Sequence, residues 1–171
     1  HLGTLVAILI YYQKELKELF IKTISGDVEK RTYVFYLFVS FCPIAFIGLF
    51  YGNFVELFFN SSIVSIALFV NGIILAATFF ISKQTVRKLT FSISLMIGIT
   101  QVLALIPGIS RSGITISTAL LLGIVHNDAA KFSFFLAIPG LLGAGFYQIF
   151  NIDISNNISI ISLIIGFISS A

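Results

Sequence analysis

Residues 101–115 read QVLALIPGISRSGIT and carry the side chains of this chain that are best suited to chemistry. Arg111 supplies a permanent positive charge. Three hydroxyl groups surround it in the sequence, those of Ser110, Ser112 and Thr115. A planar guanidinium can pair with two oxygen atoms of one anion at once, and hydroxyl groups can donate further hydrogen bonds to it. The combination predicts a site for an anion rich in oxygen, such as a phosphate.

The backbone of the same stretch also suits an anion. Pro107 and Gly108 interrupt an apolar run, and Gly113 allows a ligand to approach the chain closely. We expect a helix to restart near Ile114, so that its free N–H groups and its positive dipole end point at the break. Gln101 precedes the break by one or two helical turns and can face the polar cavity that we expect at the break.

Arg111 is the most informative of these residues. An arginine near the centre of a bilayer costs about 2.5–3.5 kcal/mol on insertion scales, and such residues are usually functional. The run at 92–124 contains no acidic residue, and the nearest one, Asp128, lies in the segment that follows. Two readings stay open: Arg111 binds an anionic ligand, or it packs and snorkels. Serine and threonine also bond to their own helix, so only their convergence on one break favours the first reading.

The composition indicates what must position these groups. Hydrophobic residues make up 58% of the 171 residues and charged residues 10%, whereas soluble domains carry about 25% charged residues. Apolar runs of about 20 residues match helices that cross a hydrocarbon core of roughly 30 Å. We therefore predict an all-α integral membrane protein, a polytopic helical bundle. Cys42 is the single cysteine, which excludes an internal disulfide and a Cys-based metal cluster. The net charge of +3, without a basic stripe, argues against a nucleic-acid partner.

Short polar loops separate the apolar runs. The runs cover about 2–12, 33–52, 62–82, 92–124, 132–150 and 158–171. Nine of the ten basic residues lie in three loops, which the positive-inside rule assigns to the cytoplasm; they are Lys14, Lys17, Lys22, Lys30, Arg31, Lys83, Arg87, Lys88 and Lys131. Because Lys88 and Lys131 flank the run at 92–124, that run should enter and leave on one side. We predict a re-entrant helical hairpin over 92–124, with a single kinked crossing as the alternative.

Other polar residues suggest structural roles. His126 and Asp128 are expected to be loop and cap residues, and Asn71 and Gly72 to pack helices together. The chain starts at His1 without a methionine and ends in an apolar run. We expect a single transmembrane domain over 1–171 that is truncated at both ends.

The run QVLALIPGISRSGITISTALLLGI, continued by DAAKFSFFLAIPGLLGA, resembles the second signature region of bacterial undecaprenyl-diphosphate phosphatases, also called bacitracin resistance proteins. Their Pro-Gly-x-Ser-Arg-Ser-Gly-x-Thr hallmark is present from Pro107 to Thr115. A weaker resemblance covers the rest of the chain. The resemblance to this family implies an inverted-repeat membrane fold with two re-entrant hairpins and six crossings, of which this chain is a fragment. It also implies a multi-pass location in the bacterial plasma membrane.

The resemblance further implies an activity: hydrolysis of the C55 isoprenyl diphosphate to the monophosphate and inorganic phosphate. This recycles the lipid carrier of cell-wall synthesis and confers bacitracin resistance. The implied catalytic residues are Arg111, Ser110 and Thr115, and the implied substrate-binding residues are Ser112, Gly108, Gly113 and Gln101. The implied cofactor is a divalent cation, Mg²⁺ or Ca²⁺, with ligands outside this chain. The expected partners are the polyprenyl diphosphate, membrane lipids and, as an option, a second copy in a homodimer.

The family's first signature, an acidic segment followed by Pro-x-Ser-Ser-Thr-Gly-His, does not occur here. We do not take His1 for the motif histidine, and we expect the chain alone to be inactive. The acid phosphatases that act on membrane lipids need a histidine six residues after the arginine, where this chain has Ser117. A secondary transporter or lipid flippase stays open as an alternative, since broken helices also bind anions in transporters.

Overall fold

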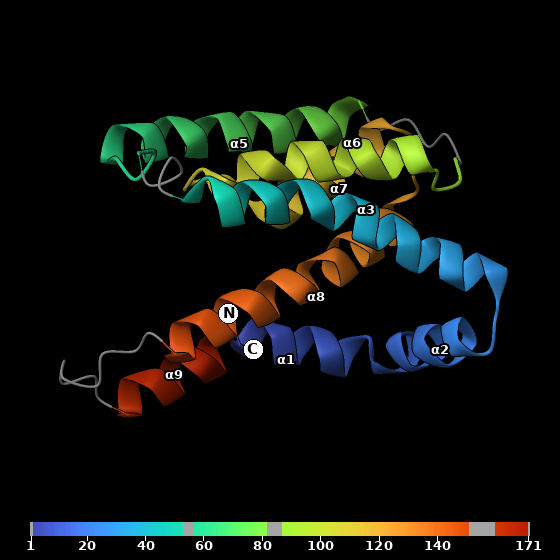
Figure 1. Cartoon of the computed structure of the whole chain (residues 1–171). Helices are drawn as coiled ribbons and strands as arrows, with labels where there is room; N and C mark the ends of the chain where they lie inside the picture. The colour runs from blue at the N-terminus through green and yellow to red at the C-terminus, as the bar shows by residue number, and fades with distance from the viewer. Residues whose placement is uncertain (1, 53–56, 82–86, 151–159, 171) are drawn as a thin grey trace. The chain divides into compact units, whose positions relative to one another are not determined.

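A computed structural model describes residues 2–52, 57–81, 87–150 and 160–170. Within these ranges it contains helices and no strand, which confirms the all-α prediction. The helices are α1 (Leu2–Tyr11), α2 (Gln13–Ile24), α3 (Val28–Phe50), α5 (Ser61–Ile81), α6 (Phe91–Gln101), the 3₁₀ helix η1 (Val102–Leu105), α7 (Arg111–Leu121), α8 (His126–Phe150) and α9 (Ile160–Ser170), drawn in Figure 1. His1, Lys83 and the predicted loop at 151–157 lie outside the described residues.

Two of these helices are long and apolar enough to cross a membrane: α3 over Val28–Phe50, and α5 over the span Ser61–Thr78. Many of their large apolar side chains remain exposed, for example Phe38 at 64% and Phe69 at 71%. Exposed phenylalanine on a long apolar helix is what contact with lipid requires, because lipid tails bury such side chains as well as a protein core does. The helical membrane character predicted from the composition is consistent with this, whereas the inverted repeat stays a prediction.

The chain divides into two compact parts, which are described separately: residues 1–30 with 137–171, and residues 31–136. In the first part, α1 packs against α9, and Thr4 Oγ1 donates to Ser170 O at 3.0 Å. A Cβ added to Gly145 would lie 2.6 Å from Leu2 Cδ2, so α8 passes close to α1 there.

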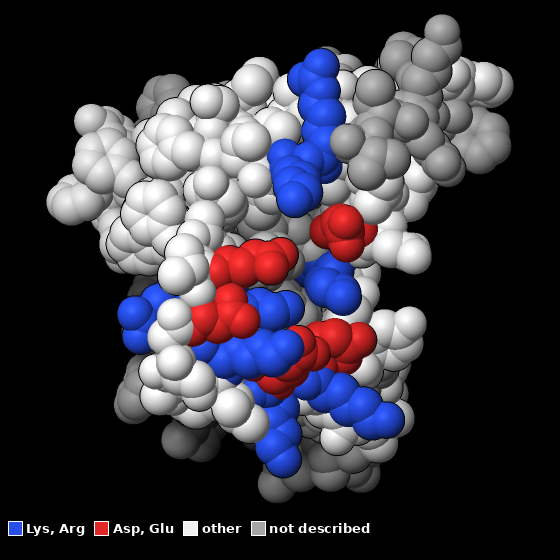
Figure 2. All heavy atoms as spheres, turned by 90° about the vertical axis from the view of Figure 1, so that its right-hand side faces the viewer, with Lys and Arg blue, Asp and Glu red and all other residues white. Residues whose placement is uncertain are grey.

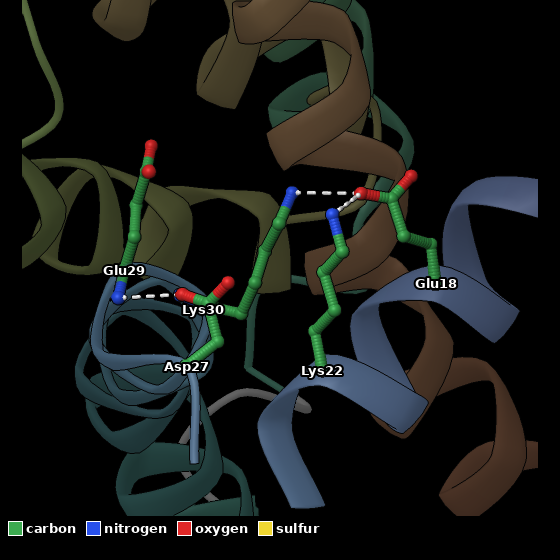
Figure 3. A network of polar contacts seen from close by, with 5 residues as sticks. All are labelled: Glu18, Lys22, Asp27, Glu29 and Lys30. Atoms are coloured by element: carbon green, nitrogen blue, oxygen red, sulfur yellow. Dashed lines mark hydrogen bonds and ion pairs between the residues drawn. The ribbon is translucent and has the colours of Figure 1, made fainter. Parts of the chain in front are cut away.

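The prediction of a polar loop after residue 12 is wrong in part, because residues 13–24 form α2. Its sequence QKELKELFIKTI is rich in strong helix formers. Lys22 Nζ lies 2.8 Å from Glu18 Oε1 one turn away, and Lys30 Nζ reaches the same oxygen at 3.5 Å (Figure 3). Figure 2 shows basic and acidic side chains interspersed on the face in view. The prediction took the dense charge of this segment for a loop, although Lys, Glu, Gln and Leu are also strong helix formers.

The next helix begins at an aspartate cap. Gly26 has φ +93°, which ends the preceding turn in the left-handed region. Asp27 Oδ1 then accepts hydrogen bonds from the N–H groups of Glu29 at 3.0 Å and Lys30 at 3.2 Å, the first of which is drawn in Figure 3. An aspartate that accepts from the first turn satisfies amides that the helix itself leaves unpaired. This cap sets the start of α3 at Val28.

In the second part, α6 and α7 run side by side in opposite directions, with α5 along α7 (Figure 1). The two ends remote from the break are joined, because Arg87 N donates to Gly123 O at 2.9 Å. The segment therefore returns to its starting level as a helix–break–helix hairpin. Ile97 and Leu136 are almost fully buried at the centre of the apolar core of this part.

Helix α3 packs closely on α6 through small residues. A Cβ added to Gly98 would lie 2.6 Å from Ser40 O, and Ser40 Oγ donates to Ser94 O at 2.6 Å. Both serines are fully buried. Small side chains let helix backbones approach and form such bonds, as in membrane helix pairs. The hairpin is thereby held from its α6 side.

Candidate functional site

The break in the hairpin is a tight turn specified by its own sequence. Ile109 N donates to Ile106 O at 3.2 Å across Pro107 and Gly108, and Gly108 has φ +102°. Proline at the second position and a positive-φ glycine at the third are the signature of a type II turn. Ile106 is extended, with φ −74° and ψ 121°, as residues before proline prefer. The predicted break thus lies where the sequence indicated.

Ser110 is the N-cap of α7. Its Oγ accepts a hydrogen bond from Gly113 N at 3.1 Å, and its carbonyl accepts the first helical bond from Ile114 N at 2.9 Å. The helix therefore restarts at Arg111, three residues before the predicted Ile114. The amides of Arg111 and Ser112 precede that first bond, so the helix supplies no acceptor for them. Together with the helix dipole, they form an end of α7 that favours an anion.

Arg111 is the first residue of this helix and is half-buried. Its Nε atom is buried and has no hydrogen-bond partner among the described residues. A buried donor of a charged group without a partner is costly, so such groups are normally paired or bind a ligand. Ser112 and Gly113, next to it, are also half-buried. The start of α7 therefore combines a guanidinium, open amides and small residues at one place.

Thr115 is placed differently from the other predicted catalytic residues. Its side chain is 1% exposed, and its Oγ1 lies 2.6 Å from Ser133 Oγ on α8. The same hydroxyl lies 2.9 Å from Arg111 O, to which it can donate. The structure therefore brings Thr115 into the contact between α7 and α8, together with Ser133, which the sequence analysis did not single out. Its catalytic role stays a prediction.

Gln101 is the last residue of α6 and is fully buried. Neither polar atom of its amide group has a hydrogen-bond partner among the described residues. Thr100 Oγ1 lies 3.0 Å from Thr118 Oγ1, and this pair sets the register between the two helices. At 1.5 Å per residue, Arg111 lies about 10 Å along α7 from Thr118. On this register the backbone of Gln101 lies about 9 Å along the helix axis from that of Arg111, and the role of Gln101 as a substrate ligand stays a prediction.

Asn71, expected only to pack helices, touches the break directly. Its side chain is 8% exposed, and its Oδ1 accepts a hydrogen bond from Ser110 N at 3.1 Å. The available signal was a lone amide in the middle of a run of apolar residues, where an unpaired polar group would be costly. His126 and Asp128, predicted as loop and cap residues, both lie in the first turn of α8.

A divalent cation such as Mg²⁺ or Ca²⁺ would need a group of oxygen ligands at the site. No group of three or more His, Cys, Asp or Glu side chains that could hold a metal ion occurs among the described residues. The donors at the break are a guanidinium, hydroxyls and amides, which suit anions and not Mg²⁺ or Ca²⁺. The residues described here do not fit a divalent cation, and the predicted cation, whose ligands were expected outside this chain, stays a prediction.

Comparisons with known proteins agree with the motif. A family model described as bacitracin resistance protein BacA matches residues 1–171. An undecaprenyl-diphosphatase of Methanococcus maripaludis is 33% identical over 172 residues, covering 99% of this chain and 69% of that protein. Undecaprenyl-diphosphatase 3 of Acinetobacter baylyi is 35% identical, with 99% and 66% covered. A relative from Acinetobacter baumannii is 32% identical, with 99% and 64% covered. The chain spans about two thirds of the length of these relatives.

Proposed function

The chain belongs to the BacA family of bacitracin resistance proteins, and from this premise we propose that it carries the phosphate-binding half of an undecaprenyl-diphosphatase active site. The observation that carries the proposal is the start of α7, where the buried Nε of Arg111 has no partner among the described residues. Relatives that cover almost the whole chain are named undecaprenyl-diphosphatases. The substrate class, a polyprenyl diphosphate, offers the multi-oxygen anion that such a site needs.

In the proposed reaction, a nucleophile attacks the terminal phosphorus of the diphosphate. The bond from that phosphorus to the bridging oxygen breaks, and its electron pair stays on the isoprenyl monophosphate. Water supplies the oxygen and protons of the inorganic phosphate that is released. Arg111 and the open amides at the start of α7 stabilise the negative charge of the transferred group and the oxygens that flank it. Ser110 holds these amides in place because its hydroxyl caps the helix.

We further propose that the hairpin is re-entrant and that the protein is a multi-pass protein of the bacterial plasma membrane. The bond from Arg87 N to Gly123 O supports re-entrance, since a segment whose ends meet begins and finishes at one level. A broken helix within a bilayer needs protein or a water-filled cavity around its freed backbone groups. Helix α5 lies against Gly108 and supplies a partner for one of these groups, because Ser110 N donates to Asn71 Oδ1 at 3.1 Å. The inverted repeat and the homodimer rest on the family resemblance alone.

The experiment that tests the proposed function measures phosphate release from a polyprenyl diphosphate by the purified full-length protein and its Arg111 variants. A guanidinium engages paired oxygens as a fork, whereas an ammonium acts as a compact point charge. Loss of one charge-assisted hydrogen bond removes about 1.5–3 kcal/mol. At 1.36 kcal/mol for each tenfold change in rate, Arg111→Lys should lower turnover about tenfold to hundredfold. Arg111→Ala should lower it further, and Ser110→Ala less.

Two controls are needed to interpret the result. Matching thermal melts should show that each variant is folded, and Lys131→Ala should serve as a cation removed elsewhere in the chain. Movement of the lipid substrate without release of phosphate would support the transporter or flippase alternative. Near-normal turnover in a folded Arg111→Ala protein would refute the phosphate-binding role of the break.

A further inference from the structure

We propose that α5 is the template that holds the break in its anion-binding shape, and that Asn71 is the positioning residue that sets where α7 begins. The inference rests on the proposed function, because it explains how the phosphate-binding end of α7 is kept in place. It differs from that proposal in assigning a role to a helix and a residue that the signature motif does not contain.

A single face of α5 lies alongside the break. Its residues are Val64, Ala67, Asn71 and Leu75, spaced by three, four and four, which is the repeat of one helical face. A Cβ added to Gly108 would lie 2.7 Å from Val64 O and 3.1 Å from Ala67 Cβ. At the other end, a Cβ added to Gly113 would lie 3.2 Å from Leu75 Cδ2.

The contacts keep the same order along both segments. Gly108 meets the first turn of this face, Ser110 meets Asn71 one turn further, and Gly113 meets Leu75 one turn beyond that. Twelve residues of α5, Val64–Leu75, which span about 16 Å at a rise of 1.5 Å per residue, therefore lie alongside six residues of the break. Because the break contacts three successive turns of α5, these contacts fix its position along that helix.

Asn71 provides the polar contact in this series. Ser110 is the N-cap residue, so its own N–H lies outside the hydrogen-bond ladder of α7 and needs an external acceptor. Asn71 Oδ1 accepts from it at 3.1 Å, on a side chain that is 8% exposed. The bond goes to the backbone of the residue directly before Arg111. Asn71 thus acts on the guanidinium and the open amides through the chain that carries them.

The predicted consequence is a loss of positioning when the acceptor is removed. Asn71→Leu retains the size of the side chain and leaves Ser110 N without its acceptor, so the start of α7 can shift. A displacement of about 1 Å at a catalytic group can cost about hundredfold in rate. We expect kcat to fall about 10-fold to 100-fold. Asn71→Asp keeps an oxygen at the acceptor position and should retain more activity than Asn71→Leu.

Thr78→Val is the matched control on the same helix. Thr78 is also buried, at 4% exposed, but its hydroxyl donates within α5, to Ile74 O at 2.7 Å. The variant removes a buried polar group and leaves the break untouched, so turnover should stay within about twofold of the wild type. If α5 were generally sensitive to apolar substitution, the turnover of Thr78→Val and that of Asn71→Leu would both fall.

The experiment measures kcat for phosphate release from a polyprenyl diphosphate, the thermal melt, and the Kd of inorganic pyrophosphate. The full-length proteins compared are the wild type, Asn71→Leu, Asn71→Asp, Thr78→Val, Arg111→Lys and the double variant Asn71→Leu/Arg111→Lys. If Asn71 acts through Arg111, the two losses in kcat should be less than multiplicative. Asn71→Leu should also weaken pyrophosphate binding about tenfold. If it melts too low to assay, Asn71→Ser, whose hydroxyl is too short to reach Ser110 N, replaces it.

The outcomes separate the two proposals. A wild type that binds pyrophosphate and releases no phosphate overturns the proposed function, and the pyrophosphate Kd of the Asn71 variants still tests the positioning role. An active wild type with a folded Asn71→Leu variant of near-normal kcat and Kd overturns the inference. Losses in Asn71→Leu and Arg111→Lys that multiply fully in the double variant also overturn it.

Discussion

Gly108 is the residue at which the geometry of the break can be tested most directly, by the substitution Gly108→Ala. Its φ of +102° lies in a region that residues with a Cβ rarely adopt. The cost of holding alanine there is about 1–3 kcal/mol. The new Cβ would also lie 2.7 Å from Val64 O, a backbone atom that cannot rotate away. Overpacking of this kind costs about 1–3 kcal/mol.

Together these two costs predict that Gly108→Ala destabilises the protein by about 2–6 kcal/mol. For chains of this size, each kcal/mol lowers the melting temperature by about 2–4 °C. The expected drop is therefore about 4–24 °C, measured by circular dichroism melts of the detergent-solubilised full-length protein. Phosphate release should fall as well, because the turn can relieve the overlap only by moving away from α5.

Gly72→Ala on α5 is the matched control, since a Cβ added there meets no atom within 4 Å. In a helix interior, alanine is more stable than glycine by about 0.5–1 kcal/mol, so this variant should melt at or slightly above the wild type. The two glycine substitutions should thus change stability in opposite directions. A Gly108→Ala protein that melts within about 2 °C of the wild type, which is less than the shift of a single kcal/mol, would refute the left-handed turn against α5.

Two further predictions concern the membrane topology and the charged helix. In a Cys42→Ser background, single cysteines at the exposed positions Lys88 and Asn127 should react with an impermeant maleimide from the same side of the membrane; labelling from opposite sides would contradict re-entrance. The hydrogen bond from Lys22 lowers the pKa of Glu18, so the contribution of this carboxylate to stability is present above its ordinary pKa and is lost as the pH falls through the lowered one. Both side chains are exposed, so this contribution is small and Glu18→Gln should leave the melting temperature at neutral pH nearly unchanged. A clear drop would contradict the expectation for an exposed ion pair.

Local sequence determined the features of the site that depend on neighbouring residues. A proline followed by a glycine in an apolar run specifies a break, and the structure has a type II turn there. The serine before Arg111 is a strong N-cap, so the helix restarts next to the guanidinium. The apolar composition predicted the helical class for the same reason, because helices satisfy their own backbone groups in lipid.

Tertiary structure decided what the predicted polar residues touch. Thr115 and Ser112 are equivalent as hydroxyl donors in the sequence, yet the helical rotation between them turns Thr115 towards Ser133 on α8 and leaves Ser112 half-buried at the helix start. Gln101 precedes the break by only a few residues, but the register of α6 against α7 places it at another level of the bundle. Asn71 lies 39 residues from Ser110 in the chain, so no local pattern could reveal their bond. Spacing along one helix determines which residues share a face, whereas contacts between helices depend on how those faces pack, and this is decided only when the chain is folded.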